Sequence, residues 1–562
     1  PTSVGLFSNT VWSIVRSKAG WILSTETPFV GDPTDGVGAL AISKDHGLSW
    51  FPIANSGNVF TGAGRTTLGV GRPGDDVVYA FAANIADFAQ LDLFRSTNGG
   101  QNWTALDLPN KTPVNPNPDQ PDMNVMGGQA FYNQMVLVDP SDKTRNSVYI
   151  GGQLSSTKST DGGATWKVIA NWLAQFGLPY VHADYHAAAA FVPAKDGDDD
   201  KDDRTPSMLM FGTDGGLFVS FNHGNTWDDD RNEGVVSLLG YSINSNPQTP
   251  DTAIMGLQDN GTFVRRGSSK VWEQPIGGDG LGTAWSQANN DTVLGTVEFS
   301  QIFRSSADNP LLQSQFDDAS AGIDPGPQGA FTTFFTSLAT PHAGADPSGR
   351  AFFTYTHAAV YRTNNGARHW MSIGQNGLAG KPTKGISATR VFRDAVHGIG
   401  VSPEPNGGLE HVAVVCSGGF VVVTRNGGHG WHEASLIDTV PNWQGFNSSA
   451  EWADNHVLYV ASESPFPGAR VAKSTDGGLT YRDSSTGLPD LPINRILVST
   501  VSPSTVYAAT FLGVYRSTDA GATWSRFGTD LPQVEVFDMY MPPDGSFLRI
   551  ATYGRGVWET KP

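Results

Sequence analysis

The chain has 562 residues, with 66 glycines, 35 prolines and a formal net charge of −18 at pH 7. A chain of this length exceeds one compact hydrophobic core, so it must contain repeats or several domains. The acidic balance argues against nucleic acid and anionic membranes as partners, because both require a basic face. No apolar run is long enough to span a bilayer.

One short pattern, Ser/Thr-x-Asp/Asn-x-Gly-x-Ser/Thr-Trp, occurs eight times along the chain in recognisable form. The copies begin at Ser43, Ser96, Ser159, Ser220, Thr363, Thr424, Ser474 and Ser517. The Asp or Asn can accept hydrogen bonds from backbone N–H groups two residues on, and the glycines supply positive φ. The closing Trp or Tyr is a large apolar anchor for the next strand. Outside one gap the pattern recurs every 43 to 63 residues, which predicts a repeat fold.

Each repeat has the same order of elements, seen most clearly in residues 131–169 and 493–527. Three strand-like segments with alternating apolar residues precede the pattern, and a fourth follows the Trp. No segment of comparable length has a helical period. We therefore predict an all-β fold, a β-propeller built from about ten or eleven four-stranded blades.

The gap between Trp227 and Trp370 is expected to hold two modules that lack the pattern, at residues 240–274 and 280–313. The last module, 536–560, has only three strand-like segments. We expect its fourth strand to come from the N-terminus, which would pair the first strand with the last one and remove an exposed edge. Residues 1–562 would then form one propeller region, either as a single large ring or as two packed propellers.

Three local features carry weaker signals. The single cysteine, Cys416, cannot form an internal disulfide and is expected to be a buried small apolar residue. The acidic run Lys195–Arg204 is interpreted as a solvated hairpin tip, although the aspartates at 196–203 could also bind Ca²⁺. Sequons, which matter only if the source glycosylates its proteins, occur at Asn102, Asn110, Asn260, Asn290 and Asn447.

The first group of candidate site residues lies in the segment VHADYHAAAAFVP. His182, Asp184 and His186 stand at positions i, i+2 and i+4, so on a strand they would point the same way. Two imidazoles with a carboxylate between them can hold a metal, or provide a general base. The alternative is that these side chains only satisfy backbone groups in the propeller channel.

The second group consists of carboxylates and amides beside glycines in later modules. They are Asp214, Gln258, Asp259, Asn260 and Asp279. Equivalent loops of successive blades meet at one mouth of a propeller, so we expect a site shared with His182 and His186. Ordinary turn chemistry is the alternative for each Asp-Gly. Trp172, Tyr180 and Trp285 are candidates to stack on sugar rings, unless they serve blade packing.

These motifs resemble known families. The repeated pattern resembles the Asp-box, or BNR repeat, and the order HxDxH, GTDGG, GLQDNG, GGDG with the ending LRIATYGRGVWE resembles secreted, sortilin-like BNR-repeat proteins of the glycosyl hydrolase type. Those are distantly similar to glycoside hydrolase family 74. The resemblance implies a secreted propeller that acts on carbohydrate. No FRIP segment typical of sialidases occurs, and the two catalytic aspartates of family 74 cannot both be aligned.

Three functions remain open from the sequence. A glycoside hydrolase of extracellular polysaccharide would use an acid/base pair from Asp184, Asp214, Asp259 and Asp279. A polysaccharide lyase would use His182 or His186 as base, with a metal or Arg265 and Arg266 neutralising a uronate. A non-catalytic propeller would bind glycan or peptide. We expect an extracellular monomer that requires no cofactor.

Overall fold

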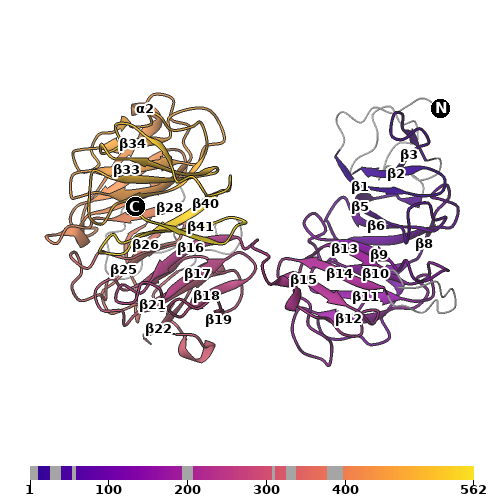
Figure 1. Cartoon of the computed structure of the whole chain (residues 1–562). Helices are drawn as coiled ribbons and strands as arrows, with labels where there is room; N and C mark the ends of the chain where they lie inside the picture. The colour runs from indigo at the N-terminus through magenta and orange to yellow at the C-terminus, as the bar shows by residue number, and fades with distance from the viewer. Residues whose placement is uncertain are drawn as a thin grey trace. The chain divides into compact units, whose positions relative to one another are not determined.

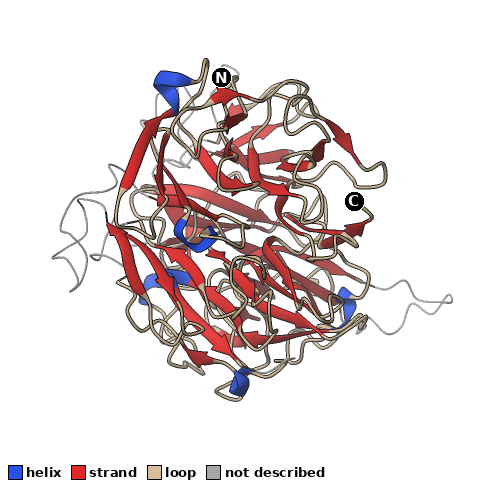
Figure 2. Ribbon diagram, turned by 90° about the vertical axis from the view of Figure 1, so that its left-hand side faces the viewer, coloured by secondary structure: helices blue, strands red, loops and turns tan. Residues whose placement is uncertain are grey.

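The computed structural model describes residues 10–25, 40–53, 59–192, 207–306, 310–324, 337–357, 359–375 and 396–562. Strands dominate these ranges, and the helices are short (Figure 2). The chain divides into two compact units, Pro1–Val235 and Val236–Pro562 (Figure 1). We call them unit 1 and unit 2 and describe each by itself.

The described strands form eleven antiparallel sheets, nine with four strands and two with three. Each sheet is a blade in which consecutive strands pair in chain order. This confirms the predicted β-propeller architecture at the higher of the two expected blade counts. The modules expected at 240–274 and 280–313 are both present as blades.

Unit 1 contains four blades. Their strands are β1 (Val11–Arg16), β2 (Trp21–Thr25), β3 (Leu40–Ser43) and β4 (Phe51–Pro52); β5 (Ala63–Gly69), β6 (Val78–Asn84), β7 (Gln90–Ser96) and β8 (Thr104–Ala105); β9 (Met135–Val138), β10 (Val148–Gly151), β11 (Ser155–Ser159) and β12 (Lys167–Asn171); and β13 (Tyr185–Phe191), β14 (Met208–Thr213) and β15 (Gly216–Ser220). The first strands pack in order, β1 on β5, β5 on β9 and β9 on β13.

Unit 2 contains seven blades. Their strands are β16 (Gly240–Ser245), β17 (Ala253–Leu257), β18 (Gly261–Arg265) and β19 (Trp272–Ile276); β20 (Thr283–Trp285), β21 (Val293–Val297), β22 (Gln301–Ser305) and β23 (Asp317–Asp318); β24 (Leu338–Ala339), β25 (Phe352–Tyr355), β26 (Ala359–Thr363) and β27 (Met371–Gln375); β28 (Val396–Val401), β29 (Val412–Cys416), β30 (Phe420–Thr424) and β31 (Trp431–Ser435); β32 (Asn447–Trp452), β33 (Leu458–Ser462), β34 (Val471–Ser474) and β35 (Arg482–Asp483); β36 (Ile493–Val498), β37 (Val506–Thr510), β38 (Gly513–Ser517) and β39 (Ser525–Phe527); and β40 (Val536–Tyr540), β41 (Leu548–Thr552) and β42 (Val557–Thr560).

The helices of the described residues are single turns. They are η1 (Leu108–Asn110), η2 (Asp230–Asn232), η3 (Glu298–Ser300), η4 (Gln313–Gln315), η5 (Gly408–Glu410) and α2 (Leu436–Thr439). None of them is long and apolar enough to cross a membrane.

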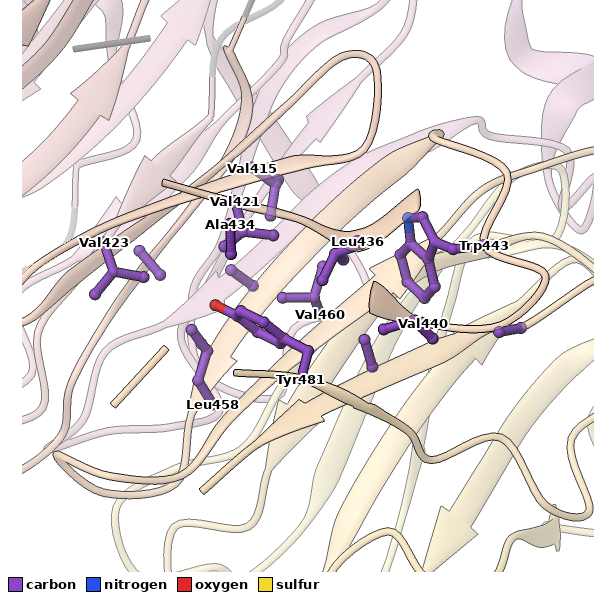
Figure 3. Packing of buried hydrophobic residues seen from close by; sticks show 14 of the residues in the cluster. Val415, Val421, Val423, Ala434, Leu436, Val440, Trp443, Leu458, Val460 and Tyr481 are labelled. Atoms are coloured by element: carbon purple, nitrogen blue, oxygen red, sulfur yellow. The ribbon is translucent and has the colours of Figure 1, made fainter. Parts of the chain in front are cut away.

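The hydrophobic cores lie between neighbouring blades. In one of them, Val421 of β30 and Val460 of β33 converge with the ring of Tyr481 (Figure 3). Burying one such side chain contributes about 1.5–3 kcal/mol. Cys416, as predicted, is buried.

Unit 2 closes into a ring through packing of its first and last blades. Strand β16 packs against β40 as well as against β20, and the labels of β16 and β40 lie close together in Figure 1. Ile243 and Met255 of the first blade share a core with Tyr540 and Ala551 of the last one. Strand β1, in contrast, pairs with β2 in unit 1. The described strands therefore do not make the expected pairing of the first strand with the last, and packing closes the ring instead.

The repeated pattern forms the turn after the third strand of each blade that carries it. In the turn at Ser159, the Ser159 hydroxyl donates to Asp161 and accepts from the Gly163 backbone N–H at 2.9 Å. Oδ1 of Asp161 accepts from the backbone N–H of Thr165 at 2.9 Å, four residues on and not two as expected. Trp166 closes the turn by donating from Nε1 to the Gly163 carbonyl at 3.1 Å. The pattern thus builds the blade.

Two expectations about surface segments have different outcomes. The acidic run Lys195–Arg204 lies outside the described residues. Asn447 is 2% exposed, and its amide nitrogen donates to the carbonyls of Cys416 and Phe420. The sequon at this residue is therefore not accessible for glycosylation in the folded protein.

Candidate functional site

The first candidate site, which we call the His–Asp cluster, lies in unit 1. It consists of Tyr132, Asn133, Asp184, His186 and Asp214. The first two precede β9, Asp184 and His186 lie at the start of β13, and Asp214 lies in the two-residue turn between β14 and β15. Two neighbouring blades therefore supply its side chains from loops and strand ends, as is typical of propeller sites.

Asp214 accepts a hydrogen bond at each of its carboxylate oxygens. Nε2 of His186 lies 2.7 Å from Oδ1, and the Tyr132 hydroxyl donates to Oδ2 at 2.9 Å. The two rings meet edge to face, with centroids 4.7 Å apart. The His186 side chain is 32% exposed, and its Nδ1 has no hydrogen-bond partner within the described ranges. A carboxylate thus orients an imidazole whose other nitrogen can accept a proton.

Asp184 brings a second carboxylate to the cluster. One of its oxygens lies within 4.8 Å of an oxygen of Asp214, and it accepts a hydrogen bond from the amide of Asn133. Its backbone is in the left-handed region, with φ of 62°, which Asp tolerates better than most residues. The backbone N–H groups of Asp184 and Tyr185 donate to the carbonyls of Gln153 and Gly152. The preceding blade therefore fixes the position of this carboxylate.

His182 packs against the turn that carries Asp214. A Cβ atom on Gly215 would lie 2.3 Å from Cγ of His182, far closer than van der Waals contact. Only glycine lets the turn approach the imidazole in this way. The Asp-Gly pair at this turn thus has a packing requirement beyond ordinary turn chemistry.

A row of aromatic rings leads from the protein surface to the cluster. Phe88 and Phe131 are 37% and 55% exposed, and their centroids lie 5.4 Å apart. Phe131 in turn lies 6.5 Å from Tyr132, whose ring contacts His186. Exposed aromatic faces of this kind are suited to stack on apolar faces of a ligand.

The second candidate site, the Asp–Glu cluster, lies in unit 2 and consists of Gln258, Asp259, Asp279 and Glu298. Asp259, with φ of 59°, lies in the β17–β18 turn, and its backbone N–H donates to the Asp279 carboxylate at 2.6 Å. The backbone N–H of Asp279 donates to the Glu298 carboxylate at 2.8 Å. Three carboxylates are thus linked in sequence by the backbone of neighbouring loops.

Two tyrosines hold the Gln258 end of this cluster. The hydroxyls of Tyr241 and Tyr553 both donate to Oε1 of Gln258. Burial raises the pKa of Tyr241 above its ordinary value, and the nearby Tyr553 adds to the effect. Tyr241 therefore stays protonated and acts as a donor. Asn260 donates from its side chain to the Gln258 carbonyl at 3.0 Å, and this hydrogen bond stabilises the turn.

The structure brings some pairs of the predicted site residues together. His186 and Asp214 meet, as do Asp259 and Asp279, but the first pair lies in unit 1 and the second in unit 2. The expectation that His182, Asp184 and His186 share one face of a strand is wrong. Strand β13 begins only at Tyr185, and the left-handed turn at Asp184 breaks the alternation.

The aromatic candidates also differ from one another. Trp285 is fully buried in a core of unit 2, and its Nε1 donates to the Asn290 carbonyl. It cannot stack on a substrate. Tyr180 and Trp172 are 37% and 38% exposed, so their proposed role stays a prediction.

The proposed metal site at His182, Asp184 and His186 does not form in unit 1. Among the described residues, these three do not bring their ligand atoms into one group, because His186 turns to Asp214. The alternative Ca²⁺ loop at 196–203 lies outside the described residues.

Sequence reasoning missed Tyr132, Asn133 and Glu298. Tyr132 and Asn133 stand in the segment FYNQMVLVDP, where they read as the approach to a strand. Glu298 follows β21 in a segment without a neighbouring glycine. Their contacts join different blades, which a pattern within one repeat cannot show.

No protein-family model matches the chain, and no curated protein matches it by sequence. Among solved structures, it is similar to YCF48 from Cyanidioschyzon merolae, at 15% identity and a TM-score of 0.41, over 58% of this chain and 95% of that one. It is also similar to an ancestral GH74 enzyme, at 14% identity and a TM-score of 0.42, over 100% and 92% of the two chains. A GH74 xyloglucanase from Xanthomonas campestris has 14% identity and a TM-score of 0.29, over 100% and 99%. Likenesses of this size do not indicate a shared activity.

Proposed function

We propose that this protein is an extracellular glycoside hydrolase that cleaves a polysaccharide at the His–Asp cluster. The observation that carries the proposal is the pair of carboxylates of Asp184 and Asp214, whose oxygens lie within 4.8 Å of one another. Retaining glycosidases place their two carboxyl groups about 5–5.5 Å apart, whereas inverting enzymes leave room for a water between them. The spacing therefore favours a retaining mechanism.

The hydrogen bonds support a different role for each carboxylate. Asp214 is held by Tyr132 and His186 at both oxygens, which orients it as the nucleophile that attacks the anomeric carbon. Asp184 then protonates the glycosidic oxygen as the bond from that oxygen to the anomeric carbon breaks. In the second step Asp184 accepts a proton from water, which releases the sugar from Asp214.

The aromatic row supplies a binding surface for this reaction. Phe131 and Phe88 lie at the exposed end of a line of rings that reaches His186. Successive sugar rings stacked along this line would bring a glycosidic bond to the two carboxylates. The proposed substrate is therefore an extended chain and not a free monosaccharide.

A second candidate function is a polysaccharide lyase with His186 as base. Nε2 is bonded to Asp214 and Nδ1 is available, so Nδ1 would take the proton from the carbon next to a uronate carboxyl. The bond to the leaving oxygen then breaks and a carbon–carbon double bond forms. The net charge of −18 disfavours such an anionic polymer.

One assay separates these functions. The protein is incubated with neutral plant and microbial polysaccharides and with polyuronates, and both reducing ends and the ultraviolet absorbance of unsaturated uronates are measured. Reducing ends alone support the hydrolase, and both signals together support the lyase. Binding of a glycan without either signal would leave only a binding propeller and would refute both reactions.

Variants connect the activity to the cluster. Asp184→Asn and Asp214→Asn should each lower turnover by a hundredfold or more, the lower range for loss of a general acid–base group. The control Asp122→Asn changes an exposed turn of the same unit and should keep full activity. Retention of anomeric configuration, followed by proton NMR, tests the spacing argument, and an inverted product would contradict it.

A further inference from the structure

Unit 2 contains a cavity of about 980 Å³ along the axis of its ring. All seven first strands line it, from β16 round to β40. The cavity lies wholly within this unit, so the closed ring forms its walls. No residue of the His–Asp cluster takes part in it.

Three charged side chains face this channel from adjacent blades. Glu451 lies on β32, Arg495 on β36 and Asp538 on β40. Arg495 lies 3.5 Å from the Glu451 carboxylate and 3.6 Å from that of Asp538. The backbone N–H of Ile243 donates to the other oxygen of Asp538 at 3.0 Å, which ties this carboxylate to the first blade. We call these three side chains the channel triad.

The single guanidinium of the triad does not neutralise the negative charge of the carboxylates around it. It serves two carboxylates at long distances, and within the described residues its Nε makes no hydrogen bond. Glu404 and Glu463 line the same cavity, and no lysine does. Burial raises the pKa of Glu451 to about 7, and burial raises the pKa of Asp538 as well. Further positive charge would therefore stabilise the channel.

The rest of the wall is polar or apolar; it includes His342, His357 and His397, whose pKa burial lowers, so that they favour the neutral form. Leu338, Ile399 and Val401 line it on other strands, and they offer contact for methylene groups. Thr283 also lines the cavity; it is 5% exposed, and its hydroxyl has no hydrogen-bond partner among the described residues. A buried hydroxyl without a partner is unfavourable, so a ligand that forms a hydrogen bond with it would be favoured.

We propose that the channel of unit 2 binds an aliphatic compound with primary ammonium groups, such as a diamine, with one ammonium at the carboxylates of Glu451 and Asp538, where it competes with Arg495. The methylene chain packs on the apolar wall, and a second ammonium reaches another acceptor of the cavity. A metal ion fits less well, because the channel carboxylates do not form a group of three converging ligands within the described part of the chain. This binding site is independent of the proposed hydrolysis in unit 1.

Calorimetric titration of the intact chain tests the proposal with cadaverine, its neutral analogue pentanediol, the dianion glutarate and CaCl₂. Cadaverine should bind, and the other three should not. Binding of pentanediol with equal affinity would show an uncharged pocket, binding of glutarate would show an anion site at Arg495, and binding of Ca²⁺ alone would show a metal site. Each of these results, or no binding of cadaverine, overturns the proposal.

Variants that remove a negative or a positive charge from the triad distinguish a ligand site from a structural ion pair. Asp538→Asn and Glu451→Gln should each weaken cadaverine binding about tenfold or more, the range for loss of a hydrogen bond to a charged group. Arg495→Gln removes the competing cation and should strengthen it. Glu273→Gln, an exposed change on β19, should have no effect. Circular dichroism establishes that each variant is folded. Thr283→Val, which removes the hydroxyl without changing the charge of the channel, should also weaken cadaverine binding. Unchanged affinity in both carboxylate variants would refute the site.

Discussion

Arg549 is the side chain whose loss should most directly weaken the ring of unit 2. It lies on β41 of the last blade and is 1% exposed. Its Nε and Nη2 donate to the Glu559 carboxylate at 3.1 and 2.7 Å. Its Nη1 reaches the first blade, where it donates to the Ser245 hydroxyl and to the Pro250 carbonyl at 2.8 Å. The guanidinium therefore links the two blades whose packing closes the ring.

The structure allows an estimate of the cost of Arg549→Met. The Glu559 side chain is 45% exposed, so water can solvate it after the change, and this ion pair contributes at most about 1 kcal/mol. The Ser245 hydroxyl and the Pro250 carbonyl lose their donor in a buried place, at about 1 kcal/mol or more each. The total is about 3 kcal/mol, which corresponds to a fall of about 5 °C in the melting temperature for a unit of this size.

Differential scanning calorimetry measures this change on the transition of unit 2. Arg555→Met is the matched control, because Arg555 is exposed on the same hairpin and its side chain, among the described residues, donates only to the neighbouring Gly554 carbonyl. The control should leave the transition in place. If the two variants melt at the same temperature, Arg549 does not stabilise the contact between the first and last blades, and the reasoning is refuted.

Three further predictions concern other parts of the chain. Asp161→Asn should cost under about 1 kcal/mol, because Asn fills this place in other copies of the turn, whereas Asp161→Ala should cost about 1–2 kcal/mol in urea unfolding. Burial raises the pKa of Glu451 from 4.5 to about 7, so unit 2 should lose about 3 kcal/mol as the pH rises through that range, and Glu451→Gln should remove this loss. Gly215→Ala should force the turn that carries Asp214 away from His182, displace this carboxylate and abolish turnover in a folded protein, while Gly212→Ala, where a Cβ would lie 3.7 Å from its nearest neighbour, should be tolerated. Activity in Gly215→Ala equal to that of its control would contradict the packing argument.

The blade architecture could be predicted because its signals are local. In the turn at Ser159, the hydrogen bonds made by the side chains of Ser159, Asp161 and Trp166 join residues within the span from Ser159 to Trp166. The glycines at 162 and 163 have φ of 77° and 97°, as the pattern requires. A sequence window of eight residues thus contains all of these bonds, and the neighbouring Asn146 carbonyl only adds an acceptor for the Gly162 backbone N–H.

The division into two units had no such signal. The boundary at Val235 has no proline-rich linker, and the charged residues at 228–233 directly before it follow the Trp227 of a repeat as any surface turn could. Closure of unit 2 depends on contacts such as Ile243 with Ala551, more than three hundred residues apart. Only the folded chain shows which blades meet across such distances.

Some candidate site residues could be recognised from the sequence because they are polar residues beside glycines, as Asp214 and Asp259 are. Glu298 has no neighbouring glycine and was missed. Asp214, Asp259 and Glu298 follow the second strand of three successive blades, and Tyr553 does so in the last blade. The scaffold thus offers one equivalent position per blade, and the residue type at that position changes while the turn remains. Aspartates of the repeated pattern serve the blade, as their hydrogen bonds show. Functional residues of such a repeat protein should therefore be sought at positions that are structurally equivalent in every blade but differ in residue type.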